Sequence, residues 1–407
     1  MTAKHDGRRI RLGMVGGGEG AFIGAVHRIA ARLDDRYELV AGALSSTPDR
    51  SARSAAALGL DPSRAYADFA TMAREEAALP DGIEAVSIVT PNHLHAAAAH
   101  AFLDAGIHVV CDKPLTTTLE EARALAAHAR RSSLVFALTH NYTGYPMVRQ
   151  ARDMVRAGKL GTIRVVQVEY AQDWLAGPFE DTGNKQAAWR TDPAQAGAGG
   201  CIGDIGTHAF NLAAFVTGLA AEAVSAELTT FVPGRRLDDD VRAMLRYAGG
   251  ARGGLWASQV AVGEENEVRL RVYGTAGGLD WCQRDANSLS YTPLGGVRQV
   301  LTRNGSGATE ANRRASRVPA GHPEGYLEGF ANIYSDTADA ILAARDGLVG
   351  QDRLFPSVDD GVAGLAFIEA AVRSSGAGGA WTPLLRDAGP DGPDAPPRSS
   401  ATGSRPG

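Results

Sequence analysis

The sequence contains little cysteine and no long apolar run. Its three cysteines, Cys111, Cys201 and Cys282, are scattered over 407 residues without a CxxC spacing. Such a set is typical of a reducing compartment and argues against a disulfide framework or a zinc site, so we expect no metal. No stretch approaches the roughly 20 apolar residues of a membrane-spanning helix, and residues 1–9 lack the apolar core of a signal peptide. We expect a cytoplasmic protein with no membrane partner.

An excess of one charge is also missing. The chain has 41 basic and 46 acidic residues, for a net charge of −5. This balance offers no electrostatic reason to expect nucleic acid as a partner. Hydrophobic residues make up 44% of the chain, an ordinary share for a globular protein. Because 407 residues exceed a single core, the length predicts two domains.

The first regular stretch indicates a dinucleotide-binding fold. Alternating apolar residues at 10–15 lead into a glycine-rich turn at 16–24, and a helix-like run follows at 25–33. Glycine lets the backbone approach a pyrophosphate closely, and the N–H groups that open the helix face the phosphates.

The spacing within this turn is irregular. Gly16 and Gly18 have the usual separation, but Gly24 lies further on than the third glycine of the standard fingerprint. Either Ala21 takes the close-packing role of that glycine, or a short insertion precedes Gly24. The cofactor contacts expected in this turn are Gly16, Gly18, Phe22 and Ile23.

Strand-like and helix-like runs alternate after the turn, as a doubly wound parallel sheet requires. Thr118 and Glu121 have the spacing of a capping box that opens a helix ending near Ser132. A last apolar strand is predicted at 134–138. We therefore predict a dinucleotide-binding domain over residues 9–138.

The end of the second predicted strand bears on the choice of dinucleotide. An acidic residue there would bind the 2′-hydroxyl of the adenosine ribose and favour NAD. The chain instead has Ser45 at or near that place, followed by Ser46, with Arg50 close by. A 2′-phosphate would not be repelled, so the pattern slightly favours NADP, while Asp49 keeps NAD open.

Three ordered motifs make the chain resemble a known family. Residues 90–95 (TPNHLH) and 111–114 (CDKP) resemble the TPNxxH and EKP signatures of the glucose–fructose oxidoreductase/inositol dehydrogenase/MocA (Gfo/Idh/MocA) family. Residues 199–208 (GGCIGDIGTH) resemble its GGxxxDxGxH signature. Asp112 stands where the family has glutamate, and this shorter acid should still orient its neighbour. The resemblance extends from about residue 8 to 382.

The resemblance implies an α/β fold with an N-terminal Rossmann domain and a C-terminal α/β domain built on a large, mostly antiparallel open sheet. The strand-like runs of the second half follow one another without crossover helices, which independently predicts antiparallel pairing. We place this substrate-binding domain at 139–384. Residues 1–8 and the polar, proline-rich 385–407 are predicted to be disordered.

The resemblance also implies the catalytic residues Lys113, Asp204 and His208. Lys113 and His208 would hydrogen-bond the reacting oxygen, with one of them as general base, and Asp204 would orient the pair or bind an adjacent hydroxyl. A lysine accepts a proton near neutral pH only if burial or positive charge lowers its pKa, whereas histidine ordinarily titrates in that range. The sequence leaves the choice between the two open.

Further site residues follow from the motifs and their neighbours. The remaining cofactor contacts are expected at Ser45, Ser46, Arg50, Thr90, Pro91, Asn92, His95, Asp112 and Lys113. The substrate contacts are expected at Lys113, Tyr142, Trp189, Asp204, His208 and His322.

The function implied is an NAD(P)-dependent oxidoreductase that acts on a secondary ring alcohol or ketone of a sugar, glycoside or cyclitol. Two alternatives are an NAD-retaining enzyme that cleaves glycosides through transient oxidation, and a non-catalytic dinucleotide or sugar sensor. The expected partner is a small sugar or cyclitol. A homo-oligomer, dimer or tetramer, through the C-terminal sheet is a family expectation.

Overall fold

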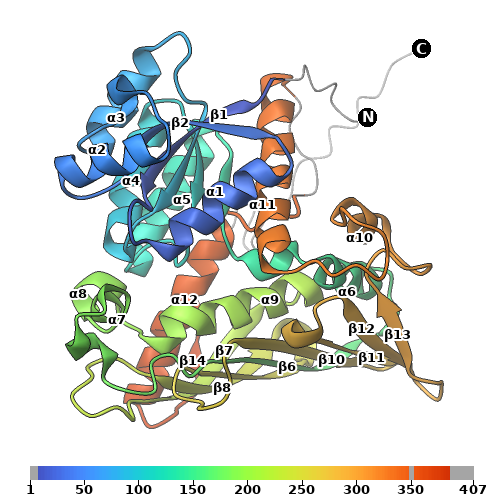
Figure 1. Cartoon of the computed structure of the whole chain (residues 1–407). Coiled ribbons are helices and arrows are strands. Elements are labelled where there is room, and N and C mark those ends of the chain that lie inside the picture. The colour runs from blue at the N-terminus through green and yellow to red at the C-terminus, as the bar shows by residue number, and fades with distance from the viewer. Residues whose placement is uncertain (1–7, 348–352, 386–407) are drawn as a thin grey trace, which may run out of the picture.

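The computed structural model describes residues 8–347 and 353–385, which form two sheets with helices between and around them (Figure 1). Of the two ends predicted to be disordered, all but Arg8 and Leu385 lie outside the described residues. None of the helices within 8–347 and 353–385 combines the length and apolar character needed to cross a membrane.

The first sheet is parallel, with strand order β2-β1-β3-β4-β5. Its strands are β1 (Ile10–Gly16), β2 (Tyr37–Ala43), β3 (Ala85–Val89), β4 (His108–Cys111) and β5 (Phe136–Leu138). The helices that follow them in sequence are α1 (Phe22–Leu33), α2 (Pro48–Ala57), α3 (Phe69–Ala78), α4 (His95–Asp104) and α5 (Leu119–Ser132). Val86 and Ile88 belong to the core shared with α4 and α5, whereas Ala85 and Val110 face α1. Both faces are therefore covered, which confirms the predicted doubly wound fold.

The second sheet has the strand order β13-β12-β11-β10-β6-β9-β8-β7-β14. Its strands are β6 (Ile163–Ala171), β7 (Ala221–Thr229), β8 (Asp240–Tyr247), β9 (Arg252–Ser258), β10 (Glu267–Gly274), β11 (Gly277–Cys282), β12 (Ser288–Pro293), β13 (Gln299–Thr302) and β14 (Thr382–Pro383). All neighbouring pairs are antiparallel except β6 and β9, which are parallel. The mostly antiparallel sheet that we predicted is confirmed.

Within the described residues, helices cover only one face of this second sheet. In Figure 1, α6 (Pro146–Arg156), α9 (Thr207–Thr217) and α12 (Val358–Gly376) lie between it and the first sheet. On β10, Val268, Leu270 and Val272 are fully buried on the helical side, whereas Tyr273 on the other side is 45% exposed. This period of two leaves the outer face of the sheet open.

A helix from late in the chain returns to the first sheet and ties the two halves together. In α11 (Tyr326–Arg345), the Tyr334 hydroxyl lies 2.8 Å from His27 Nδ1 and 2.5 Å from Ser87 Oγ. The Tyr334 carbonyl accepts a hydrogen bond from the Tyr37 hydroxyl at 3.0 Å. On the side towards the second sheet, Arg149 of α6 pairs with Asp336 at 2.5 Å, both side chains being buried. These contacts fix the position of the first sheet over the second.

The glycine-rich turn packs against the first turn of α1. Gly16 and Gly17 have positive φ angles of 79° and 70°, which favour glycine. A Cβ on Gly24 would lie 2.3 Å from Gly17 Cα and 2.4 Å from Gly17 O. Gly24, rather than Ala21, therefore takes the close-packing role that the sequence left open.

We predict that Gly24→Ala lowers the free energy of unfolding by about 1–3 kcal/mol, because the added methyl group meets backbone that must shift. It should also weaken dinucleotide binding, since the shift displaces the turn. Thermal unfolding and titration with NAD+ would measure both. The control is Gly376→Ala at the end of α12, where a Cβ meets nothing within 4 Å; it should be neutral or slightly stabilising. Wild-type stability and affinity in Gly24→Ala would contradict this account.

Candidate active site

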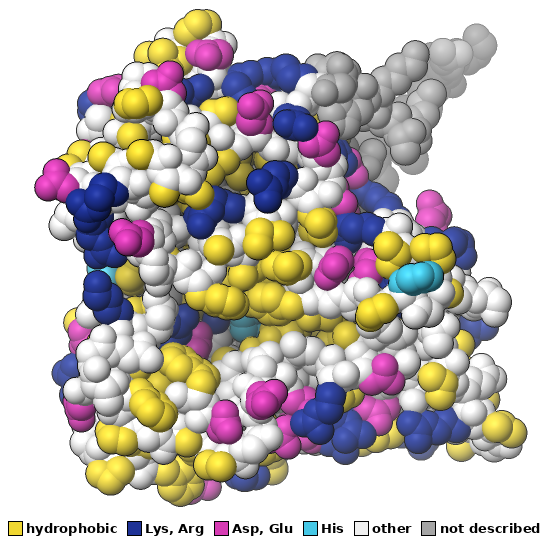
Figure 2. Space-filling view, in the orientation of Figure 1, with side chains coloured by type: hydrophobic (Ala, Val, Ile, Leu, Met, Phe, Trp, Pro, Cys, Tyr) yellow, Lys and Arg dark blue, Asp and Glu magenta, His cyan; other side chains and the backbone are white. Residues whose placement is uncertain are grey.

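The carboxyl ends of β3, β4 and β5 meet at one edge of the first sheet, where Thr90, Lys113 and Thr139 follow them. A cavity of about 620 Å³ lies between this edge and the second sheet, and Lys113 and Thr139 belong to its wall. Figure 2 shows the surface hollowed there, with hydrophobic side chains along the upper rim and a histidine inside. Ligands of open α/β sheets bind at such an edge.

Lys113 reaches from the first sheet to the second half of the chain. Its Nζ donates hydrogen bonds to the carbonyl oxygen of Asp204 at 2.5 Å and to the Asp204 carboxylate at 3.0 Å. Asp112 accepts hydrogen bonds from the Lys113 N–H and the Thr139 hydroxyl, both at 2.9 Å. The shorter acid therefore holds the backbone at Lys113 and links the ends of β4 and β5.

Asp204 lies in a π-helical turn, Ile202–Gly206, that runs directly into α9. Turns of this type are frequent at functional sites. The buried carboxylate of Asp238 holds the start of the turn, accepting hydrogen bonds from the N–H groups of Gly200 at 2.7 Å and Ile202 at 2.8 Å. Burial raises the pKa of Asp238 to about 6.

Three donors surround the Asp204 carboxylate. Besides Lys113, the Gln259 amide donates to it at 2.9 Å, and Arg190 Nε lies 3.3 Å away. Burial alone would raise the pKa of Asp204, but the charges of Lys113 and Arg190 outweigh it and lower that pKa to about 2. Asp204 is therefore a carboxylate throughout the working range of pH.

His208 is buried one turn further along, with its Nδ1 3.4 Å from Nδ1 of His140 and its ring edge-on to Tyr142. Burial lowers the pKa of His208 well below its usual value, and the nearby charge of Lys113 adds to this effect. We expected a histidine that titrates near neutral pH. Burial beside the rings of His140, Tyr142 and Tyr170 instead keeps this imidazole neutral.

Four polar residues of the second sheet complete the site and are missing from our predicted set. Tyr170, Asn266 and Gln283 line the cavity, and Gln259 holds Asp204. Each is the next residue in the series of alternate positions at which its strand points inward. In β6, for example, Tyr170 continues the series of the buried Val166 and Val168. A period of two carried to the strand ends would have found them.

Two predicted substrate contacts lie away from the cavity wall. Trp189 is half-buried in α7 (Lys185–Arg190) and carries the Arg190 guanidinium over its ring at 4.2 Å, but it does not line the cavity. His322 is exposed, four residues before α11 begins. Tyr142, in contrast, lies in the wall as predicted.

Hydrogen bonds to neighbouring segments fix the position of residues 90–95. The His95 ring bonds to the carbonyl oxygens of Pro114 at 2.8 Å and Thr90 at 2.9 Å, and Asn92 donates to Ala196 O at 3.0 Å. His95 thereby joins the ends of β3 and β4, while the half-buried Pro91 lies at the edge of the sheet between them.

The residues around the glycine turn fit a dinucleotide. A Cβ on Gly18 would lie 2.5 Å from Leu44 O, so only glycine leaves the turn open. A cavity of about 520 Å³ adjoins it, and the exposed Phe22 borders both this cavity and that at Lys113. Two buried polar atoms near the strand ends, Thr90 Oγ1 and Asn141 Nδ2, have no hydrogen-bond partner within the described chain, and a ligand with polar edges would satisfy them.

The predicted ribose contacts lie beside this turn. Ser45 follows β2 and is half-buried, Ser46 is exposed, and the Arg50 guanidinium donates to Glu19 O at 3.3 Å. Asp49 is exposed in the first turn of α2. Hydroxyls, a cation and the Asp49 carboxylate therefore all lie in the segment that follows β2.

The parallel sheet with its glycine-rich turn, and the cavity at its edge, are features of a dinucleotide-binding protein. Residues 10–151 match the oxidoreductase family with an NAD-binding Rossmann fold, and residues 148–280 match the GFO/IDH/MocA C-terminal domain. The chain belongs to the Gfo/Idh/MocA family of oxidoreductases, as its motifs suggested.

Three relatives illustrate this membership. An oxidoreductase from Sinorhizobium meliloti is 56% identical, with a TM-score of 0.83 over 92% of this chain and 99% of that one. An inositol dehydrogenase homologue from Azotobacter vinelandii, solved with NADH and myo-inositol, is 36% identical, with a TM-score of 0.85 over 92% and 98%. Levoglucosan dehydrogenase from Pseudarthrobacter phenanthrenivorans is 29% identical over 92% of this chain and 98% of its own.

The buried histidines predict loss of stability in acid. Burial lowers the pKa of His27 to about 4 and that of His140 to about 3, against 6.5 in the unfolded chain. Below pH 6.5 the unfolded chain therefore binds protons that the folded chain does not. Each such histidine should cost about 2 kcal/mol of unfolding free energy between pH 7 and pH 5.

The measurement is denaturant unfolding at several pH values between 4 and 8. His140→Asn should reduce the proton uptake on unfolding by about one near pH 5, and by much less at pH 7 and above. The control His322→Asn, on an exposed loop, should leave the slope unchanged. A stability that is flat from pH 7 to pH 5 would contradict the assignment of neutral buried imidazoles.

Proposed function

We propose that the protein is an NAD(P)-dependent dehydrogenase that transfers a hydride between the nicotinamide and a secondary ring alcohol or ketone of a sugar, glycoside or cyclitol. The observation that carries the proposal is the convergence of Lys113, Asp204 and His208 on one cavity at the dinucleotide-binding edge. Relatives that act on levoglucosan or hold myo-inositol beside NADH support the substrate class.

In this proposal, Lys113 and His208 bind the reacting oxygen. Lys113 is paired with the Asp204 carboxylate and donates hydrogen bonds, so it would stabilise negative charge as it develops on that oxygen. His208 is the neutral group with a free lone pair, so it would take the hydroxyl proton during oxidation and return it during reduction. Asp204 would keep Lys113 in place. When bound, the cofactor supplies the hydride acceptor.

The choice of cofactor is part of the proposal. The hydroxyls of Ser45 and Ser46 and the guanidinium of Arg50 would accept a 2′-phosphate, in line with the slight preference for NADP read from the sequence. The Azotobacter relative was solved with NADH. We propose that either dinucleotide binds at this turn, and each must be tested separately.

We predict that the purified protein reduces NAD+ or NADP+ with at least one of myo-inositol, levoglucosan and D-glucose. Lys113→Met should lower kcat by about 100-fold or more. Absorbance at 340 nm reports the reaction, and Lys159→Met, on an exposed turn, is the matched control. Failure with both cofactors across a broad polyol panel would refute the proposal. Glycoside cleavage without net NADH would support the NAD-retaining alternative instead.

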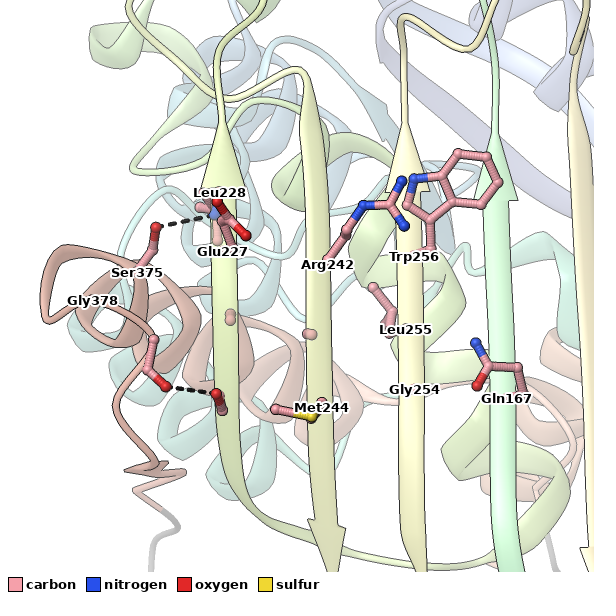
Figure 3. Close-up of a pocket in the computed structure, with 14 residues that line it drawn as sticks. Gln167, Glu227, Leu228, Arg242, Met244, Gly254, Leu255, Trp256, Ser375 and Gly378 are labelled. Carbon is pink, nitrogen blue, oxygen red and sulfur yellow. Dashed lines mark hydrogen bonds between the residues drawn. The ribbon is translucent and has the colours of Figure 1, made fainter.

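We further propose that the open face of the second sheet pairs with a second copy of the chain. Met244 on this face is 56% exposed and Val165 is 43% exposed. Figure 3 shows Gln167, Arg242 and Trp256 standing on neighbouring strands around a cavity of about 790 Å³ on this face. Exposed apolar side chains among polar ones are typical of an interface between subunits.

Met244→Glu should therefore shift the protein towards monomer, measured by sedimentation velocity at several concentrations. The control Leu79→Glu also adds a charge at an exposed apolar position, 41% exposed, but beyond the end of α3 in the first half. It should leave the mass unchanged. A wild-type protein that is monomeric at all concentrations would end this part of the proposal.

A further inference from the structure

The cavity wall that lies across from the dinucleotide edge is polar but carries no free charge. It is formed by the ends of the second sheet's strands, by the segment before α7 and by Tyr142 in the turn Asn141–Gly144 after β5. Its side chains are carboxamides and phenols, chiefly Tyr142, Tyr170, Gln172, Asn266 and Gln283. Such groups donate and accept hydrogen bonds without a charge.

Asn266 is the centre of this wall. Its Oδ1 accepts hydrogen bonds from the Tyr170 hydroxyl at 2.9 Å and from the Gln172 amide at 2.5 Å. Its Nδ2 donates to the Tyr142 hydroxyl at 3.4 Å and to Gln283 Oε1 at 3.2 Å. The network fixes the orientation of each amide, and thus which donors and acceptors face the cavity.

Each charge in the described wall has a partner. Lys113 and Arg190 both contact Asp204, and Asp112 receives hydrogen bonds from Thr139 and the Lys113 backbone. Burial raises the pKa of Tyr142 to about 12 and that of Tyr170 well above its usual value, so both phenols stay neutral. The two cations, Lys113 and Arg190, and the two carboxylates, Asp112 and Asp204, give the described wall a net charge of zero.

We propose that this wall selects an uncharged, polyhydroxylated ring and rejects phosphorylated or carboxylated analogues, with Asn266 as the residue that determines specificity. The inference rests on the proposed function and narrows its substrate class. An anion in the cavity would lose part of its hydration, and the cations there are already paired with Asp204, so this loss would not be compensated. Neutral hydroxyls can exchange hydrogen bonds with the amides one for one.

The test compares neutral and anionic members of matched pairs: myo-inositol with myo-inositol 1-phosphate, and D-glucose with D-glucose 6-phosphate and D-glucuronate. Binding to the NADH-loaded protein is measured by calorimetry and oxidation by kcat/KM. At least one neutral compound should bind, and be oxidised, 100-fold or more in preference to its anionic partner. Equal or better binding of the anion, or binding of neither class, would overturn the inference.

Two variants test the wall itself. Gln283→Lys adds a cation beside Asn266 and should shift the anion-to-neutral ratio at least tenfold towards the anion, whereas the control Gln299→Lys on β13 should not. Asn266→Ala should raise KM for the neutral compound tenfold or more with a smaller change in kcat. An unchanged ratio in Gln283→Lys would overturn the inference. Preferential binding without turnover would count against the proposed dehydrogenase activity alone and would support the selectivity.

Discussion

The ion pair between Lys113 and Asp204 is the contact on which the site depends. It joins the end of β4 to the π-helical turn before α9, so its two members come from the two halves of the chain. Both side chains are largely buried, and a buried carboxylate is tolerated only when its partners are complete. Lys113, Arg190 and Gln259 supply those partners. Removing Lys113 or Arg190 would therefore leave the Asp204 carboxylate less fully compensated.

The packing of the chain holds the two sides of this pair at the required distance. Tyr334 of α11 bonds to α1, β2 and β3, and Arg149 with Asp336 links α11 to α6. On the other side, Asp238 holds the N–H groups that lead into the π-helical turn. Its raised pKa shows that burying this carboxylate costs free energy. The fold thus accepts one costly buried acid to fix the position of another.

Local signals explain what could be predicted from the sequence. Strand alternation, the glycine turn and the motif at Lys113 are encoded within a few residues, so the two-sheet fold followed from them. The close-packing role of Gly24 required the actual approach to Gly17. Asn266 and Gln283 were predictable, because each continues the alternation of inward-facing residues in β10 and β11. We did not extend that alternation past the strand ends. Trp189 lies in the short helix α7 and His322 in the loop before α11, and the course of both segments depends on tertiary contacts. The burial that keeps His208 neutral involves residues far apart in the sequence. Spacing alone therefore predicts none of these three placements.

The charges of the site bear on how the proposed reaction can proceed. A histidine whose pKa is strongly lowered is a weak proton acceptor and, once protonated, a strong donor. Lys113 lies close enough to oppose a second positive charge on His208, while Asp204 offsets one cation only partly because Arg190 shares it. In the proposed oxidation, His208 would therefore hold the proton only briefly and pass it on towards solvent. In the proposed reduction, protonated His208 would be a strong donor to a ketone oxygen but would be sparsely populated near neutral pH, so its proton would have to be supplied from solvent.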